Sequence, residues 1–344
     1  MPIAPSHVPR LAAVSRLLGP ESVGLFVDHP EQLKTLVQID EAVWPSKIPI
    51  FVKIDAGYHR AGVPPDSDVL EKISTILASQ DRVKLIGAYA HMGHSYSSSS
   101  PKEALQYLRS EIEGALAGAE RLIRALPSTE QRMTISIGAT PTATSFQHLL
   151  SERSDHIEFL NLLDKVGKNF DLEIHAGVYP VLDMQQLATK ARVAVHGNAS
   201  RLNSDNIGLR VLVEVASTYD EREKPEALIC AGSIVLGREP CKSYSGWGVV
   251  TRWQSAGGRS QASIYDPDSS KTGWIVGRIS QEHGILTWEG DATNVRRLEI
   301  GEKVMIWPNH ACMAGPSFGW YLIVDSDQDD ADVVRDVWIR SRGW

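Results

Sequence analysis

The sequence predicts two structural parts, an α/β part built from parallel strand–helix units and an antiparallel β part that follows it. In the first part, short apolar segments alternate with amphipathic helical patterns, which implies parallel βα units in a barrel or an open sheet. From residue 207 onward the apolar runs become short, rich in β-branched or aromatic residues, and separated by Gly, Pro, Asp or Ser, as in antiparallel sheets. Eight of the nine tryptophans follow residue 246, so the composition changes in the same region.

The elements of the first part are predicted from the spacing of apolar residues. Strands are expected at residues 23–27, 50–54, 85–90, 133–137, 172–174 and 191–195. Helices are expected at residues 9–18, 30–43, 66–79 and 101–126. In the third of these helices the apolar residues recur at helical spacing and form a single face: Val69, Leu70, Ile73, Ile76 and Leu77.

The second part is predicted to contain strands and a short tail. Strands are expected at residues 209–216, 227–236, 246–253, 274–279, 285–288 and 303–307. The acidic run at residues 325–332 begins a tail that we expect to be exposed. The expected domains are therefore residues 1–206 and 207–325, followed by a tail at 326–344.

Composition excludes several classes of function. The net charge of −7 argues against a general binder of nucleic acid or anionic membranes, and no apolar run approaches the roughly 20 residues of a membrane helix. The three cysteines are odd in number and widely spaced, so we expect no disulfide framework and a reducing, cytoplasmic location. Residues 1–20 faintly resemble a transit peptide, but a helix ended by Gly19 and Pro20 is the preferred interpretation.

Two segments with functional side chains follow predicted strands of the first part. The segment 53–62 (KIDAGYHRAG) places Arg60, a permanent cation with five donors, in a loop at a strand end. A charged loop in which Asp55 and Arg60 are paired is an equally good interpretation. In the segment 89–96 (YAHMGHSY), Tyr89 and His91 project to the same side because side chains alternate along a strand. A lone histidine there would more often be an ordinary polar residue.

Two further segments are rich in small residues. The segment 136–144 (SIGATPTAT) offers hydroxyl groups and backbone amides that can hold a phosphate or a carboxylate. The segment 175–180 (HAGVYP) contains Gly177, which lets the backbone approach a ligand, and Tyr179, which can donate a hydrogen bond. Each of these segments can equally be an ordinary loop or turn.

The His310-Ala311-Cys312 segment is the candidate metal site. On an extended segment, residues two apart project to the same face, so the imidazole and the thiolate can bind one zinc ion at ~2.0–2.3 Å. Two protein ligands leave coordination positions open, which is the catalytic pattern. The alternative is a buried cysteine beside an exposed histidine. Cys230 and Cys241 are expected in the β core.

Taken together and in this order, the five segments resemble the eukaryotic-type D-serine dehydratases. These belong to the alanine-racemase-like family of pyridoxal-phosphate (PLP) enzymes, which also includes the D-threonine aldolases. The resemblance extends from about Pro2 to about Asp325. It implies an eight-stranded βα barrel that carries PLP, an antiparallel β domain, and a homodimer with the active site near its interface.

The resemblance also implies roles for particular residues. Arg60 would lie near the phenolic oxygen of PLP, His91 beside its pyridine ring, and Tyr96 would contact it from the same loop. Lys53 occupies a strand position and is not the family's Schiff-base lysine.

The resemblance places further contacts near the phosphate and the metal. Thr140 matches a contact on the phosphate side of PLP, and Gly177 and Tyr179 match the family's HAGNY segment. Val178 replaces the usual asparagine of that segment, which removes a polar contact. His310 and Cys312 match the zinc ligands.

The family's Schiff-base lysine lies in a segment like RPHVKTHK near the start of the barrel, and no segment of this sequence matches it. The first residues resemble a point well inside a full-length member. We therefore expect an N-terminally incomplete barrel with unpaired strand edges, from a truncated gene model or a fragment.

The implied reaction converts D-serine to pyruvate and ammonia, with D-threonine as a second substrate. Zinc on His310 and Cys312 would act as a Lewis acid on the departing β-hydroxyl. One alternative is a metal-dependent D-threonine aldolase, although aldolases tend to have aspartate where this chain has Cys312. Another is a catalytically inactive PLP-binding or scaffolding protein.

Overall fold

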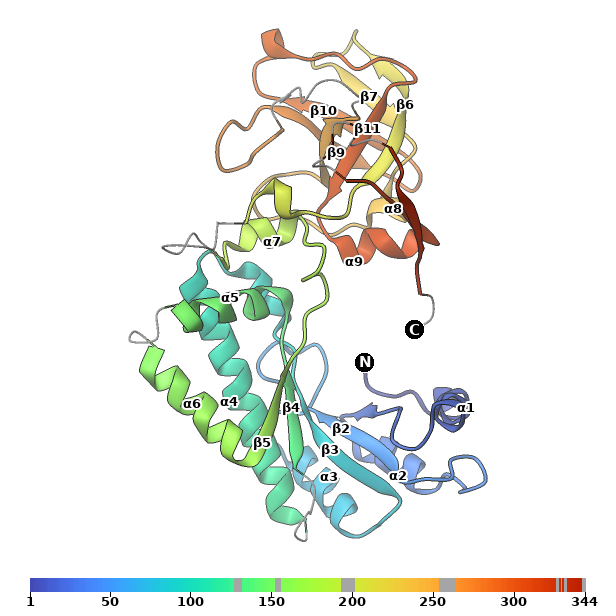
Figure 1. Ribbon diagram of the computed structural model, residues 1–344, viewed down its shortest axis with the longest axis vertical. Helices are drawn as coiled ribbons and strands as arrows, with labels where there is room; N and C mark the ends of the chain where they lie inside the picture. The colour runs from blue at the N-terminus through green and yellow to red at the C-terminus, as the bar shows by residue number, and fades with distance from the viewer. Residues whose placement is uncertain are drawn as a thin grey trace. The chain divides into compact units, whose positions relative to one another are not determined.

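The computed structural model describes residues 1–126, 132–151, 156–192, 202–253, 264–325, 328, 330 and 333–341. The chain forms two compact units. The first, here called the α/β unit, comprises Met1–Ala176 and Ala191–Ser200, and the second, here called the β unit, comprises Gly177–Lys190 and Arg201–Trp344. Figure 1 shows the helices and strands of each unit, coloured from blue at the N-terminus to red at the C-terminus. Among the described residues, no helix is both long and apolar enough to cross a bilayer.

The α/β unit contains a parallel five-stranded sheet in the order β1-β2-β3-β4-β5. Its strands are β1 (Leu25–Val27), β2 (Ile48–Lys53), β3 (Val83–Tyr89), β4 (Met133–Ile137) and β5 (Phe170–Ile174). In the described part of the chain this sheet is open, with β1 and β5 at its edges. The predicted parallel βα pattern is confirmed. The strand expected at 191–195 lies largely outside the described residues.

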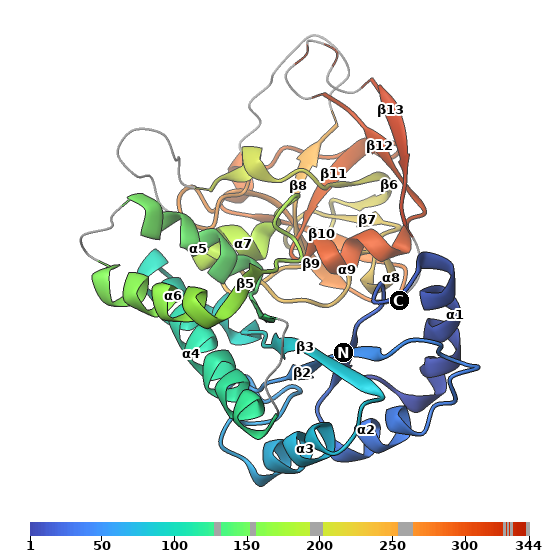
Figure 2. The same ribbon diagram turned by 60° about the horizontal axis from the view of Figure 1, so that its bottom comes forward.

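The helices of the α/β unit follow the strands along the chain (Figure 2). They are α1 (Val8–Leu18), α2 (Pro30–Val37), α3 (Asp68–Ala78), α4 (Pro101–Ala125), α5 (Thr140–Ser151) and α6 (Ile157–Asn169), with the 3-10 helices η1 (Pro5–His7) and η2 (Gly93–Ser97).

Two details of these helices differ from the expectation. Helix α2 ends at Val37 rather than residue 43, because the Asp40 carboxylate accepts a hydrogen bond from the backbone N–H of Ala42 at 2.7 Å and starts a turn. The segment after β4, expected as a loop, begins helix α5 at Thr140.

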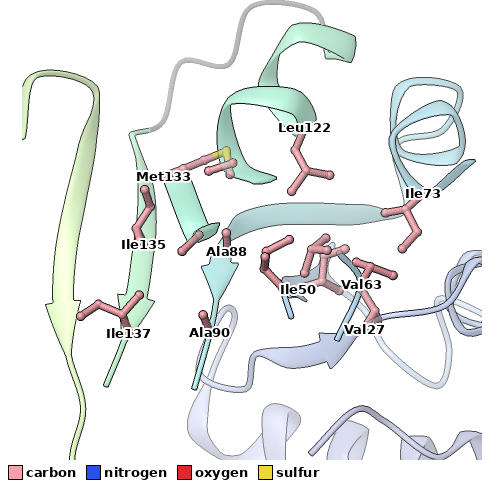
Figure 3. Close-up of a cluster of buried hydrophobic side chains, with 14 of the residues drawn as sticks. Val27, Ile50, Val63, Ile73, Ala88, Ala90, Leu122, Met133, Ile135 and Ile137 are labelled. Atoms are coloured by element: carbon pink, nitrogen blue, oxygen red, sulfur yellow. The ribbon is translucent and has the colours of Figure 1, made fainter. Parts of the chain in front are cut away.

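One apolar core joins the sheet to its helices. Figure 3 shows Ile73 of α3 and Leu122 of α4 beside Ile50 of β2 and Ala88 of β3, and all four are fully buried. Burying a large aliphatic side chain contributes about 1.5–3 kcal/mol. This packing fixes the strand ends on which the candidate site is built.

The β unit contains a closed antiparallel barrel in the order β10-β7-β6-β11-β8-β9, which confirms the predicted antiparallel part. Its strands are β6 (Val211–Tyr219), β7 (Glu226–Ile229), β8 (Gly248–Arg252), β9 (Gly273–Ile279), β10 (Gly284–Glu289) and β11 (Lys303–Pro308). Its helices are α7 (Met184–Thr189), α8 (Ser233–Leu236) and α9 (Ala311–Ala314), with η4 (Ser204–Asn206), η5 (Ala292–Asn294) and η6 (Gly315–Ser317).

Two expectations for the β unit are corrected. The strand expected at 227–236 ends at Ile229, and its second half forms α8 after Gly232, where a Cβ atom would lie 2.4 Å from the Ser280 carbonyl oxygen. Cys230 is exposed, whereas Cys241 is buried as expected. The described part of the tail includes strand β13 (Asp336–Ile339), which pairs with β12 (Trp320–Ile323), and all four residues of β13 are exposed, as expected for the tail.

Candidate active site

Three aromatic rings form a row at the carboxyl edge of the parallel sheet. Tyr89 ends β3, His91 follows two residues later, and His175 follows the end of β5. The Tyr89 and His175 rings stack with centroids 4.4 Å apart and planes 7° apart, and the His91 and His175 rings have centroids 6.1 Å apart. The sheet edge therefore brings Tyr89 and His91 to one side, as predicted. We call these three residues the ring row.

His91 has a fixed protonation pattern. Its Nδ1 lies 2.8 Å from the carbonyl oxygen of Gly138. A carbonyl oxygen can only accept, so Nδ1 carries the proton and Nε2 has the lone pair. Burial lowers the pKa of His91 to about 4, so the ring is neutral at neutral pH. His91 therefore presents a neutral ring with a basic Nε2.

Glu111 of helix α4 accepts a hydrogen bond from the Gly138 peptide. The backbone N–H of Gly138 donates to Oε1 of Glu111 at 3.0 Å, and Glu111 is fully buried. Burial raises the pKa of Glu111 to about 7. Gly138 has φ +142°, and a Cβ atom there would lie 2.1 Å from the carbonyl oxygen of His175. Only glycine fits this position.

Sequence reasoning missed Glu111 and Lys53. Glu111 lies on the buried face of α4 beside Leu108 and Ala115, and an acidic residue on an apolar helix face was the available signal. Lys53 ends β2 with only 6% of its surface exposed, and its Nζ lies 4.5 Å from the centroid of the Tyr89 ring. Burial and the nearby charge of Arg60 lower the pKa of Lys53.

His175 also gains a defined environment that sequence reasoning did not assign. Its Nδ1 lies 3.1 Å from Oγ of Ser136, whose hydroxyl donates to Glu173 at 2.6 Å. Its Nε2 is buried and has no hydrogen-bond partner among the described residues. Burial lowers the pKa of His175 to about 4. The ring row thus contains two neutral imidazoles.

Arg60 lies close to this row. Its guanidinium carbon is 5.1 Å from the centroid of the Tyr58 ring, and its charge is close enough to lower the pKa of His91. The alternative in which Asp55 pairs with Arg60 is wrong, because the Asp55 carboxylate is paired with His59 at 2.8 Å. Arg60 is therefore placed as a cation beside the ring row.

The two other predicted residues of the α/β unit lie in elements that begin at the same sheet edge. Tyr96 is half-buried in η2, which follows β3. Thr140 is the buried first residue of α5, which follows β4. The start of a helix of this length is a favourable place for an anionic group, because backbone N–H groups and the helix dipole point there.

The predicted metal ligands lie in the β unit, and the local backbone corrects the expectation. His310 is extended, but Ala311 begins helix α9, so the segment is not a continuous strand. The cause is Asp183, whose Oδ2 accepts a hydrogen bond from the backbone N–H of Ala311 at 2.9 Å. Cys312 is exposed and His310 is half-buried, so the alternative of a buried cysteine beside an exposed histidine is wrong.

The side chain of His310 also has a fixed protonation pattern. Its Nδ1 lies 2.5 Å from Oε1 of Gln185 in helix α7. Burial lowers the pKa of His310, so the ring is neutral at neutral pH. Partial desolvation by the surrounding residues raises the pKa of the Cys312 thiol although the residue is exposed, and the nearby Asp183 carboxylate adds to this effect. We call Asn309–Cys312 the His–Cys turn.

Gly177 and Tyr179 begin the β unit. A Cβ atom on Gly177 would lie 3.4 Å from Sγ of Cys312, so the structure brings Gly177 beside the His–Cys turn. Tyr179 is 43% exposed, and Val178 is buried. Among the described residues, no group of three or more His, Cys, Asp or Glu side chains is placed to hold a metal ion.

Comparison with known protein families identifies both parts of the chain. Residues 208–324 match the family described as "Putative serine dehydratase domain", and residues 7–158 match "Alanine racemase, N-terminal domain". The chain therefore has an alanine-racemase-like fold with an added antiparallel β domain.

Two fungal relatives cover almost the whole chain. The D-serine dehydratase of Schizosaccharomyces pombe is 34% identical over 349 residues, which span 100% of this chain and 72% of the relative. The D-serine dehydratase of Saccharomyces cerevisiae is 30% identical over 99% of this chain and 73% of the relative. The chain belongs to this D-serine dehydratase family of lyases.

Solved structures share the fold. The D-threo-3-hydroxyaspartate dehydratase from Delftia sp. HT23 matches with a TM-score of 0.70 and 24% identity over 100% of this chain and 78% of that chain. An alanine-racemase-like protein from Idiomarina loihiensis matches with a TM-score of 0.72 and 22% identity over 100% of this chain and 77% of that chain. Two further solved structures that share the fold are variants of D-threo-3-hydroxyaspartate dehydratase, one with a cysteine replaced by alanine, in a metal-free form, and one with a histidine two positions earlier replaced by alanine.

Proposed function

We propose that the protein is a PLP- and zinc-dependent lyase that converts D-serine into pyruvate and ammonia. The observation that carries the proposal is the His–Cys turn, in which the Nδ1 atom of His310 is bound to Gln185 and Cys312 follows two residues later. The names of the two fungal relatives support D-serine as the substrate. D-Threonine is proposed as a second substrate, because it carries its hydroxyl at the same β-position.

The donor set of the His–Cys turn fits zinc. One imidazole nitrogen and one thiolate are borderline-soft ligands of the kind that zinc prefers, and two protein ligands leave room for a substrate oxygen. The zinc ion would supply Lewis-acid stabilisation to the β-hydroxyl as it leaves. His310 and Cys312 would hold that ion.

The ring row and its neighbours fit PLP. PLP, when bound, supplies the electron sink for the charge left by loss of the α-proton. The neutral His91 ring would lie beside the cofactor ring, and Arg60 would place a permanent cation near its phenolic oxygen. The buried Nε2 of His175 has no partner in the described part of the chain, which is the kind of polar atom that a bound group satisfies.

Four further residues are proposed to contact PLP. Thr140, at the start of α5, would contact the phosphate, where the helix end favours negative charge. Tyr96, Gly177 and Tyr179 are proposed as further cofactor contacts. The side chain of Val178 is 1% exposed and carries no polar atom, so it cannot supply the polar contact of the asparagine that it replaces.

Two alternatives make different products. A D-threonine aldolase would release glycine from D-threonine. Cys312 argues against this activity, because the aldolases tend to have aspartate at this position. A catalytically inactive PLP-binding homologue would bind cofactor and zinc without turnover. It is favoured by one sequence observation, since no segment of these 344 residues matches the family's lysine segment.

Binding and turnover are therefore tested separately. Zinc content and PLP binding are measured on this chain. Pyruvate release from D-serine and glycine release from D-threonine are measured on this chain and on a longer chain that carries a relative's lysine segment ahead of Met1. Pyruvate from D-serine in the longer chain supports the proposal. Glycine from D-threonine, or no product despite bound PLP and zinc, contradicts it in favour of the first or second alternative.

The oligomeric state completes the proposal. We propose a homodimer, as the family resemblance implies. Light scattering on the purified chain measures the mass, and a mass of one chain at micromolar concentration contradicts the proposed dimer.

A further inference from the structure

We propose that Gln185 is a positioning residue of the metal site, because it holds the His310 ring in the form that presents Nε2 to a metal ion. This inference rests on the proposed zinc site and deepens it. The contact that carries it is between Oε1 of Gln185 and Nδ1 of His310, at 2.5 Å.

The orientation of the Gln185 amide is set by its second contact. Its Nε2 lies 2.8 Å from the carbonyl oxygen of Pro240. A carbonyl oxygen cannot donate, so the amide nitrogen must face Pro240 and the amide oxygen must face His310. The amide oxygen can only accept, so Nδ1 of His310 carries the proton. The lone pair of the neutral ring is therefore on Nε2.

The backbone fixes Gln185 relative to the His–Cys turn. The N–H of Gln185 donates to the carbonyl oxygen of Asn309 at 3.1 Å. Asp183 accepts from the N–H of Gln186 through Oδ1 and from the N–H of Ala311 through Oδ2, each at 2.9 Å. One carboxylate thus ties the start of α7 to the start of α9.

Asn309 ties the same turn to the segment that holds Pro240. Its Nδ2 donates to the carbonyl oxygens of Glu239 at 2.9 Å and Gly246 at 2.7 Å, and its Oδ1 accepts from the Tyr244 hydroxyl. Asn309 is 1% exposed. Both partners of the Gln185 amide, Pro240 and His310, are therefore anchored by one buried side chain. The amide has a fixed place between them.

A ligand ring that is free to exchange its proton between Nδ1 and Nε2 presents a lone pair to the metal only part of the time. A hydrogen bond that fixes the proton on Nδ1 removes this cost and orients the ring, and loss of such a partner typically lowers metal affinity about 10–100-fold. Cys312 would supply the second ligand of the metal ion. The hydrogen bond of Gln185 is to the other ligand, His310. Gln185 therefore acts through His310 alone.

The test uses three variants of the whole chain. Gln185→Met removes the acceptor while keeping the side-chain length, Gln185→Glu keeps an acceptor facing His310, and Gln281→Met is a matched control at an exposed position of the same unit. The ring nitrogen chemical shifts of ¹⁵N-histidine-labelled protein report the tautomer of His310 without metal. Competition with a chromophoric chelator reports zinc affinity.

We expect His310 in the wild type and in Gln185→Glu to be protonated at Nδ1. In Gln185→Met we expect averaged tautomer shifts and a zinc affinity about 10–100-fold weaker, with Gln281→Met unchanged. An unchanged tautomer and unchanged zinc affinity in Gln185→Met overturn the role of Gln185 while leaving the zinc site standing. Failure of the wild type to bind zinc overturns the zinc site itself. If Gln185→Met does not fold, the zinc affinity of Gln185→Glu is the deciding measurement. A zinc affinity of Gln185→Glu that is about 10–100-fold weaker than that of the wild type overturns the inference.

Discussion

The two units each hold a candidate site histidine in the same protonation pattern, but the hydrogen-bond acceptor that fixes the proton differs. In the α/β unit, His91 donates through Nδ1 to a main-chain carbonyl, that of Gly138. In the β unit, His310 donates through Nδ1 to a side-chain amide, that of Gln185. Burial lowers the pKa of both imidazoles, so both are neutral bases at neutral pH.

This difference shows where each site is vulnerable. No side-chain substitution removes the carbonyl of Gly138, so His91 is disturbed only through the backbone or through Glu111, which holds that peptide. The acceptor of His310 is removed by a single substitution. The ring row is therefore built into the fold, whereas the His–Cys turn depends on individual side-chain contacts.

Gly138→Ala is expected to cause the largest loss of stability, because the backbone at Gly138 does not accommodate a Cβ atom. The alanine Cβ would lie 2.1 Å from the carbonyl oxygen of His175, at a φ of +142° that alanine rarely adopts. We expect a loss of about 3 kcal/mol or more in the free energy of unfolding, measured by chemical denaturation.

Gly167→Ala is the matched control, since nothing lies within 4 Å of its added Cβ in helix α6. It should gain about 0.5–1 kcal/mol. Equal stability of the two variants would contradict the assigned role of Gly138.

Glu111→Gln is expected to change how stability depends on pH. Burial raises the pKa of Glu111 from 4.5 to about 7 in the folded chain. Between these values the unfolded chain loses the proton first, so wild-type stability falls as pH rises, by at most about 3 kcal/mol from this group. The glutamine variant cannot lose that proton. Its stability relative to the wild type should therefore rise between about pH 5 and about pH 8. The histidine contributions cancel because both proteins carry them, so a constant difference across this range would refute the assignment.

Asp183→Ala is expected to have a smaller effect, confined to the β unit. It removes the cap of helix α7 and the acceptor for the Ala311 N–H, both at 2.9 Å. Losing a buried acceptor costs about 1–3 kcal/mol. Denaturation followed by tryptophan fluorescence suits this unit, which contains most of the tryptophans. Asp266→Ala, which removes an exposed loop acceptor of the same unit, is the control. A loss no larger than the control's would mean that Asp183 does not hold the turn.

The sequence predicts the fold well where periodicity alone decides the structure. Strand β4 runs over Met133–Ile137 as expected, and helix α3 buries the apolar face predicted for it. Helix α5 was missed because its first five residues include three threonines, which are weak helix formers, although Pro141 is well suited to a helix start.

The site is predicted less completely, because its decisive contacts are distant in the sequence. The helical start of α9 depends on Asp183, which lies 128 residues before Ala311. The contact between Gln185 and His310 spans 125 residues. Local patterns identify His91 and His310 as candidates, but the acceptors that fix their protons follow only from tertiary structure.

The most direct test of the proposed chemistry is the zinc content of the purified chain and of its His310→Ala and Cys312→Ala variants. Elemental analysis after dialysis against trace zinc is expected to give about one zinc ion per wild-type chain and almost none in either variant. The Cys230→Ala variant, at an exposed cysteine elsewhere in the β unit, should retain the metal. A wild-type chain without zinc, or full zinc content in His310→Ala and Cys312→Ala, would contradict the proposal that this pair holds the catalytic metal.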